Sequence, residues 1–213
     1  HRHAAGLEVG QGLGARGLAL VAVDRGGAET GRVERFGELV GAVLGAREDE
    51  RAGEGGIVEQ RHQDRALART VDHQHALVDA DGANVGFPKL AKGQVALVAF
   101  IYRGCHEAQG CPASLALLRE LDRELESTPE RAARVRLATV SFDPENDTPE
   151  RMRELRELMA PRTDWSFLAP GSADALARLL TDYGQDVSPL ENGALRHVLK
   201  IFLVDDRLRI RNV

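Results

Sequence analysis

The sequence from residue 75 to its end predicts an α/β domain, in which a mostly parallel sheet is flanked by helices. Residues 95–102 and 135–142 are apolar runs of strand length, as is typical of strands covered on both faces. Leucines recur at helical spacing after the first run, at Leu115, Leu118, Leu121 and Leu125. Strand and helix patterns then continue to alternate, which favours a wound, largely parallel sheet.

The first elements follow from local signals. Residues 77–82 predict a short strand that ends in an Asp-Gly turn, and residues 112–126 predict the first helix. A second helix is expected after Thr148, which suits the N-cap, with Pro149 at the first helical position. Its inward stripe would consist of Met152, Leu155, Leu158 and Met159.

The last elements complete the expected order. Residues 165–168 predict a short strand, and Ser172 opens a third helix. A loop over 184–196 leads to a strand at 198–204, and Asp205 and Asp206 mark a turn before a final antiparallel strand. In this architecture a further helix is expected after the last strand, to cover the exposed face of the sheet. We therefore expect that the domain is truncated at its C-terminus.

Residues 1–72 differ from the rest of the chain. They contain fourteen of the 22 glycines, whereas all eight prolines lie beyond residue 87. With few exceptions they use nine residue types whose codons begin with G or C, a bias typical of a GC-rich gene read out of frame. We interpret 1–72 as a weakly ordered or non-native segment and 75–213 as the folded domain.

The net charge and the hydropathy argue against a nucleic-acid-binding surface and against a membrane span within this sequence. The net charge is −5, with both signs mixed along the chain, which argues against nucleic acid as a partner. No apolar stretch reaches the roughly 18 residues of a membrane span, and no signal peptide is visible.

The two cysteines, Cys105 and Cys111, lie six positions apart. Cys105 follows a predicted strand at the sheet edge where wound α/β folds bind ligands. Cys111 precedes Pro112 at a predicted helix N-terminus, where backbone amides favour a thiolate and a lowered pKa. The spacing indicates a reversible disulfide, a metal clamp, or both.

His197 immediately precedes the predicted strand 198–204. In a thioredoxin-like fold the residue at this position faces the cysteines, which would complete a set of two sulfurs and one nitrogen. Such a soft set of three ligands suits copper, whereas structural zinc normally takes four. His106 could supply a fourth ligand but is better explained as an exposed loop residue. Asp143 suits either a turn or a role near the cysteines.

Residues 94–213 resemble the Sco/SenC family, copper-handling thioredoxin-like proteins needed to assemble cytochrome c oxidase. The matching segments are GQVALVAFIYRGC, CPASLALLREL, VRLATVSFDPENDTPERM and RHVLKIFLVDDRLRIRNV. The resemblance implies Cu(I) bound by Cys105, Cys111 and His197. It also implies a protein that is periplasmic or membrane-associated and faces the periplasm, normally with an N-terminal membrane anchor. One departure is that five residues separate the cysteines, where the family usually has three.

These features lead to one preferred function and one alternative. The preferred function is a copper chaperone that delivers the ion to a copper-accepting oxidase subunit. The alternative is a thiol-disulfide oxidoreductase, with Cys105 and Cys111 as the catalytic redox pair, acting on cysteines of that metalloprotein partner. A peroxidase is disfavoured, because Tyr102 and Ala108 stand where it would need a threonine.

Overall fold

The computed structural model describes residues 70–71, 74–105, 110–191 and 193–212. Our interpretation of residues 1–72 therefore falls almost entirely outside the described residues. Thr70 and Val71 are the exceptions. Thr70 forms an isolated antiparallel bridge with Arg209. Val71 is fully buried, and its N–H donates to the carbonyl of Leu208 at 2.7 Å. These two residues pack against the domain.

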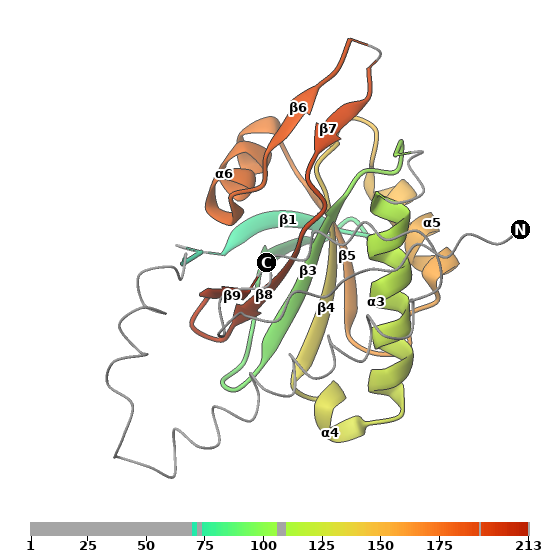
Figure 1. Ribbon diagram of the computed structural model, residues 1–213, viewed down its shortest axis with the longest axis vertical. Helices are drawn as coiled ribbons and strands as arrows, with labels where there is room; N and C mark the ends of the chain where they lie inside the picture. The colour runs from blue at the N-terminus through green and yellow to red at the C-terminus, as the bar shows by residue number, and fades with distance from the viewer. Residues whose placement is uncertain (1–69, 72–73, 106–109, 192, 213) are drawn as a thin grey trace, which may run out of the picture.

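A seven-stranded sheet forms the centre of the domain (Figure 1). Its spatial order is β2-β1-β5-β4-β3-β8-β9. The bounds are β1 His75–Asp79, β2 Asn84–Phe87, β3 Val95–Ile101, β4 Val135–Ser141, β5 Trp165–Pro170, β8 Ile201–Asp205 and β9 Ile210–Asn212.

The parallel part of this sheet is narrower than the sequence predicts. Only the β3–β4 and β4–β5 pairs are parallel, and every other pairing in the sheet is antiparallel. Part of the reason is that a hairpin forms each edge of the sheet, β1–β2 at one edge and β8–β9 at the other. The two strands of a hairpin are antiparallel because a short turn joins them, whereas a parallel pair needs a crossover.

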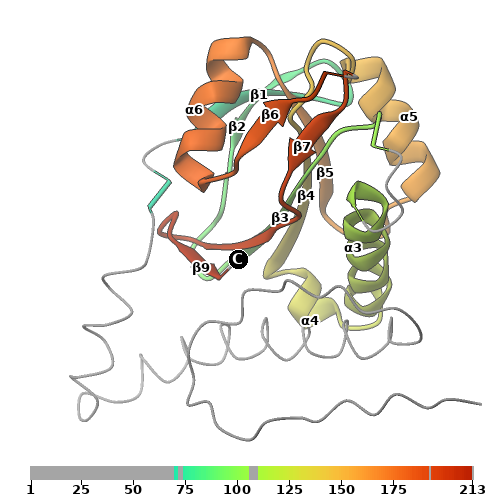
Figure 2. The same cartoon turned by 45° about the horizontal axis from the view of Figure 1, so that its top comes forward.

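Helices cover both faces of the sheet, so the predicted α/β class is confirmed. Helices α3 (Cys111–Glu126) and α5 (Pro149–Met159) lie on one side, and α6 (Ala173–Tyr183) lies on the other (Figures 1 and 2). The short helix α4 (Pro129–Ala132) was not anticipated from the sequence. Within the described ranges, no helix combines the length and the apolar character that a membrane crossing requires.

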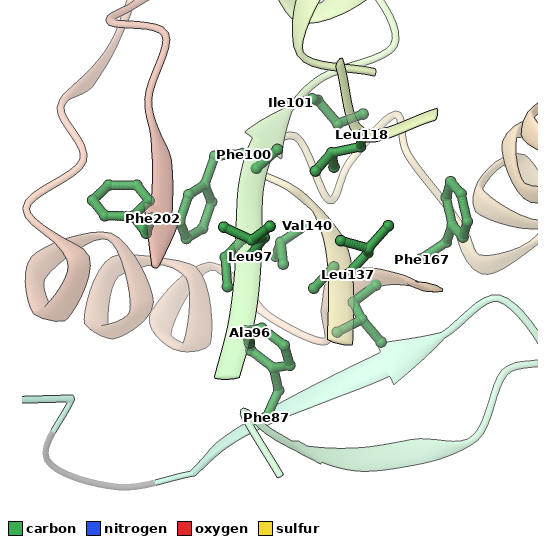
Figure 3. Close-up of a cluster of buried hydrophobic side chains, with 14 of the residues drawn as sticks. Phe87, Ala96, Leu97, Phe100, Ile101, Leu118, Leu137, Val140, Phe167 and Phe202 are labelled. Atoms are coloured by element: carbon green, nitrogen blue, oxygen red, sulfur yellow. The ribbon is translucent and has the colours of Figure 1, made fainter. Parts of the chain in front are cut away.

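Strand β3 is buried along its whole length, as its apolar run predicts. Phe100 packs edge-on against Phe202 of β8 and Tyr183 of α6, with ring centroids 5.6 and 5.1 Å apart. Figure 3 shows Phe100 beside Phe202 on one side of β3, and Ile101 beside Leu118 of α3 on the other. Two packed faces hold β3 in place, and its C-terminal end leads directly to Cys105.

Three local expectations prove wrong. The predicted loop over 184–196 contains a second, two-stranded sheet formed by β6 (Val187–Pro189) and β7 (Leu195–His197). Strands of three residues are too short for their alternation to be recognised. The following strand, β8, begins at Ile201 rather than at residue 198. Leu158 is 68% exposed, because the inward stripe of α5 buries only Met152 and Leu155.

Replacing Thr148 by alanine is expected to lower the free energy of unfolding by about 1 kcal/mol. Its hydroxyl is the N-cap of α5 and accepts a hydrogen bond from the Arg151 N–H at 3.5 Å. Urea denaturation followed by the fluorescence of Trp165, the single tryptophan, would measure the change. Thr148→Ser keeps the acceptor and serves as the control. Equal loss of stability in both variants would contradict the capping role.

Candidate metal centre

Three separate segments bring Cys105, Cys111 and His197 together, and His197 lies 86 positions after Cys111 in the sequence. Cys105 lies in the turn after β3, Cys111 is the first residue of α3, and His197 is the last residue of β7. Their ligand atoms all lie within 4.8 Å of one another, and both cysteines are free thiols. No other group of three or more metal-ligating side chains occurs among the described residues. All three predicted site residues therefore meet.

The turn that carries Cys105 is tied to the sheet by hydrogen bonds. The Cys105 N–H donates to the carbonyl of Tyr102 at 3.2 Å. The Arg103 N–H donates to the carboxylate of the buried Asp147 at 3.1 Å, and the Ser141 hydroxyl donates to the same oxygen at 2.7 Å. Because Ser141 ends β4, the turn is anchored to the neighbouring parallel strand. Burial raises the pKa of Asp147, and these two hydrogen bonds partly oppose that rise.

The Cys111 thiol has a raised pKa, which corrects the expectation of a low one. The pKa is raised to about 12, with burial as the largest cause and a smaller contribution from the neighbouring Cys105. Backbone hydrogen bonds from Tyr102 and from Cys111 itself lower it only in part. The helix N-terminus is present as predicted, but the loss of water around the sulfur outweighs it. In the metal-free protein at neutral pH, Cys111 is therefore a thiol.

The His197 ring is oriented by a backbone carbonyl and by two aromatic rings. Its Nδ1 lies 3.0 Å from the carbonyl oxygen of Leu195. A carbonyl can only accept, so Nδ1 carries a proton, and in the neutral form of the ring Nε2 then presents its lone pair. Nε2 lies 3.5 Å from the Cys111 sulfur. The rings of Tyr102 and Phe142 pack against the imidazole, with centroids 5.5 and 5.0 Å away.

The arrangement fits a soft metal ion. Bonds of about 2.3 Å to sulfur and about 2.0 Å to nitrogen would hold three donors roughly 4 Å apart around one ion. The observed separations, 3.5 Å between Cys111 and His197 and at most 4.8 Å for any pair, need only small adjustments. Both cysteines are buried and His197 is half-buried, so the imidazole is the ligand closest to solvent.

Other residues considered from the sequence have different outcomes. Asp143 is outside the donor group, and its carboxylate accepts two hydrogen bonds from the Asn146 side chain at 3.0 Å, which makes it a turn residue. His106 belongs to residues 106–109, which lie outside the described residues. Sequence reasoning missed the packing of Tyr102 and Phe142 on the imidazole. The only available signal was that each aromatic directly follows a buried strand.

Comparisons with known proteins identify structural relatives of this chain. No curated protein matches the sequence. In structure the chain resembles ScoI of Bradyrhizobium japonicum, solved with copper bound, at 26% identity and a TM-score of 0.52. The match covers 64% of this chain and 84% of that one. It also resembles BsSco, described as a member of the Sco family of cytochrome c oxidase assembly proteins with a disulfide switch. That match has 26% identity and a TM-score of 0.54, and covers 68% and 81% of the two chains.

A third solved structure and a sequence profile complete the comparison. A SCO1/SenC family lipoprotein from Bacillus anthracis str. Ames shares the fold, at 22% identity and a TM-score of 0.58. The match covers 68% of this chain and 84% of that one. These likenesses confirm the predicted thioredoxin-like fold. The profile of the SCO1/SenC family matches residues 63–213, which is well over half of the sequence. The chain therefore belongs to the SCO1/SenC family.

Proposed function

We propose that this protein is a copper chaperone, which binds Cu(I) through Cys105, Cys111 and His197 and delivers it to a copper-accepting subunit of cytochrome c oxidase. The observation that carries the proposal is the convergence of two thiols and one imidazole within 4.8 Å. Thiolates are soft ligands that select Cu(I), and three donors suit it better than they suit structural zinc. The copper bound to the Bradyrhizobium relative supports the same choice.

Loading and release both follow from the burial of the ligands. Loading requires reduced cysteines, because the ligands are two thiolates. Cu(I) binding to two thiols releases two protons, so loading is favoured by higher pH. The half-buried His197 is the neutral and more accessible ligand. An incoming thiolate from the acceptor would displace the imidazole first, and the ion would then pass by ligand exchange. The assembly role described for BsSco supports an oxidase subunit as the acceptor.

The alternative function is a thiol-disulfide oxidoreductase with Cys105 and Cys111 as its redox pair. Two free sulfurs at most 4.8 Å apart favour it, because a small movement would let them bond. Their oxidation to a disulfide would release two protons and two electrons, which would reduce one disulfide of the metalloprotein partner to two thiols. The disulfide switch described for BsSco is consistent with such a pair.

An anaerobic titration separates the two functions. Reduced protein is titrated with Cu(I) against a competing chelator, and we expect one tightly bound copper per chain. Protein whose cysteines have been oxidised to a disulfide should bind none. In parallel, the reduced, copper-free protein is mixed with a small-molecule disulfide, and thiol release is followed. Weak copper binding together with fast exchange would overturn the chaperone and favour the oxidoreductase.

We further propose a periplasmic or membrane-associated location that faces the periplasm. The proposal follows from membership of the SCO1/SenC family and from the expected oxidase partner, whose copper site has to be reached by the donor. Cell fractionation combined with protease treatment of intact spheroplasts would test it. Protection of the protein from the protease in intact spheroplasts would contradict a periplasmic location.

A further inference from the structure

Tyr102 contacts all three residues of the candidate metal centre without being a ligand itself. Its carbonyl accepts a hydrogen bond from the Cys105 N–H at 3.2 Å, and its backbone also hydrogen-bonds the Cys111 sulfur. Its ring meets the His197 imidazole edge-on, with centroids 5.5 Å apart and planes at 87°. One buried residue thus links three segments that are separated by up to 92 positions in the sequence.

The hydroxyl group of Tyr102 acts on His197 through a single intervening residue. The Leu195 N–H donates to the Tyr102 hydroxyl oxygen at 3.4 Å. The carbonyl of the same Leu195 accepts the hydrogen bond from His197 Nδ1 at 3.0 Å. The hydroxyl therefore holds the residue whose carbonyl selects the tautomer of the imidazole.

This contact matters because His197 is not part of the main sheet. Among the strands that the structure describes, β7 pairs only with β6, in the separate two-stranded sheet, which projects beyond the end of the main sheet (Figure 1). The pairing of β7 with β6 does not fix how His197 is oriented toward the cysteines. Side-chain contacts between β7 and the main sheet therefore help to set that orientation. Phe142 contributes a ring contact, and Tyr102 contributes both a hydrogen bond and a ring contact.

The Tyr102 ring has little freedom to move. Phe142 packs against it with ring centroids 5.2 Å apart. A Cβ added at Gly104 would lie 3.2 and 3.3 Å from two of its ring carbons, which is closer than ordinary van der Waals contact. Glycine at this position therefore leaves room for the ring, and a larger residue would force the ring or the turn to shift by a few tenths of an ångström.

We propose that Tyr102 is a positioning residue that orients His197 toward the two cysteines, through its hydroxyl on Leu195 and its ring on the imidazole. The inference rests on the proposed copper site, but the orientation that it describes exists in the copper-free protein. The two can therefore be tested separately.

The test compares the two tyrosines of the chain. Tyr102→Phe removes only the hydroxyl, and Tyr183→Phe is the matched control. Tyr183 is also buried, but its hydroxyl has no hydrogen-bond partner in the described structure and it packs against Phe100 and Phe202. In Cu(I) competition titrations on the full chain, Tyr102→Phe should lose about tenfold in affinity, since partners that orient metal ligands are worth roughly 10–100-fold. Tyr183→Phe should match the wild type.

A copper-free measurement separates orientation from metal binding. Nitrogen NMR of the His197 ring should report a single Nδ1-protonated tautomer in the wild type and a mixture in Tyr102→Phe. Amide hydrogen exchange at Leu195 should be faster in the same variant. Gly104→Ala crowds two carbons of the Tyr102 ring, and it should change the His197 signals and weaken copper binding even if Tyr102→Phe does not fold.

Each outcome decides one of the two proposals. Copper affinity and ring signals that are unchanged in both Tyr102→Phe and Gly104→Ala would overturn the positioning role. Unchanged affinity with faster exchange at Leu195 would also overturn it, because the hydroxyl would then hold the strand without orienting the ligand. A wild-type protein that binds no Cu(I) would defeat the copper site, and the His197 ring signals alone would then decide whether Tyr102 orients the imidazole.

Discussion

Replacing His197 by alanine is expected to weaken Cu(I) binding at least about 100-fold, because residues that only orient a metal ligand are already worth roughly 10–100-fold. The variant removes the only nitrogen donor of the group and leaves two buried thiols. Two sulfurs can still hold Cu(I), so weakened binding is expected rather than complete loss. The copper-free variant should remain folded, since the imidazole is half-buried at the end of a short strand.

Competition titrations with a Cu(I) chelator measure this loss, and Arg196→Ala is the matched control. Arg196 is exposed and adjacent to His197 on β7, so its side chain projects from the opposite face of the strand. Its removal should leave the affinity unchanged. Equal affinities of His197→Ala and the wild type would show that the imidazole is no ligand, and the chaperone proposal would lose its third donor.

Asp205→Asn is expected to lower the free energy of unfolding by about 3 kcal/mol, the scale seen when one partner of a buried ionic network is removed. The Asp205 side chain is fully buried at the end of β8. It accepts hydrogen bonds from the N–H groups of Arg207 and Arg209 at 2.8 and 3.0 Å, and from the Arg209 side chain at 3.0 Å. An asparagine would present an amide N–H₂ to at least one of these donors, where only an acceptor fits.

The same variant should also change the dependence of stability on pH. Burial alone would raise the pKa of Asp205, but the hydrogen bonds from Arg209 and Arg207 outweigh it and lower the pKa. A lowered folded-state pKa means that the charged form is stabilised by folding. This contribution is fully present above the unfolded pKa of about 4, and it is lost as the pH falls through the folded value. The difference between wild type and Asp205→Asn should therefore shrink below about pH 4.

Urea denaturation at several pH values, followed by the fluorescence of Trp165, measures both effects. Asp164→Asn is the control, because the ion pair of Asp164 with Arg136 is exposed, with the two side chains 46% and 40% accessible. Exposed pairs contribute between zero and about 1 kcal/mol. If the two variants lose equal stability, the buried network around Asp205 does not have the role assigned to it.

Much of the architecture could be predicted from local sequence patterns. The apolar run that forms β3, the N-cap at Thr148 and the helix start at Cys111 were all recognisable, because each depends on residues within one or two turns of chain. The hairpin of β6 and β7 was not recognisable, since three-residue strands show no usable alternation. The antiparallel pairing of β1 with β5 also depends on distant partners that local patterns do not reveal.

The sequence by itself determined the donor set, which consists of two cysteines at the ends of neighbouring elements and a histidine near the last strands. This set of donors in turn favours a soft metal. Tertiary structure alone decided how these groups behave. It buries Cys111, so loss of hydration outweighs the helix N-terminus and raises its pKa. It also sets Tyr102 against Leu195 and His197, residues more than 90 positions away. Burial and long-range contacts exist only after the chain has folded, whereas residue types and spacings are already present in the unfolded chain.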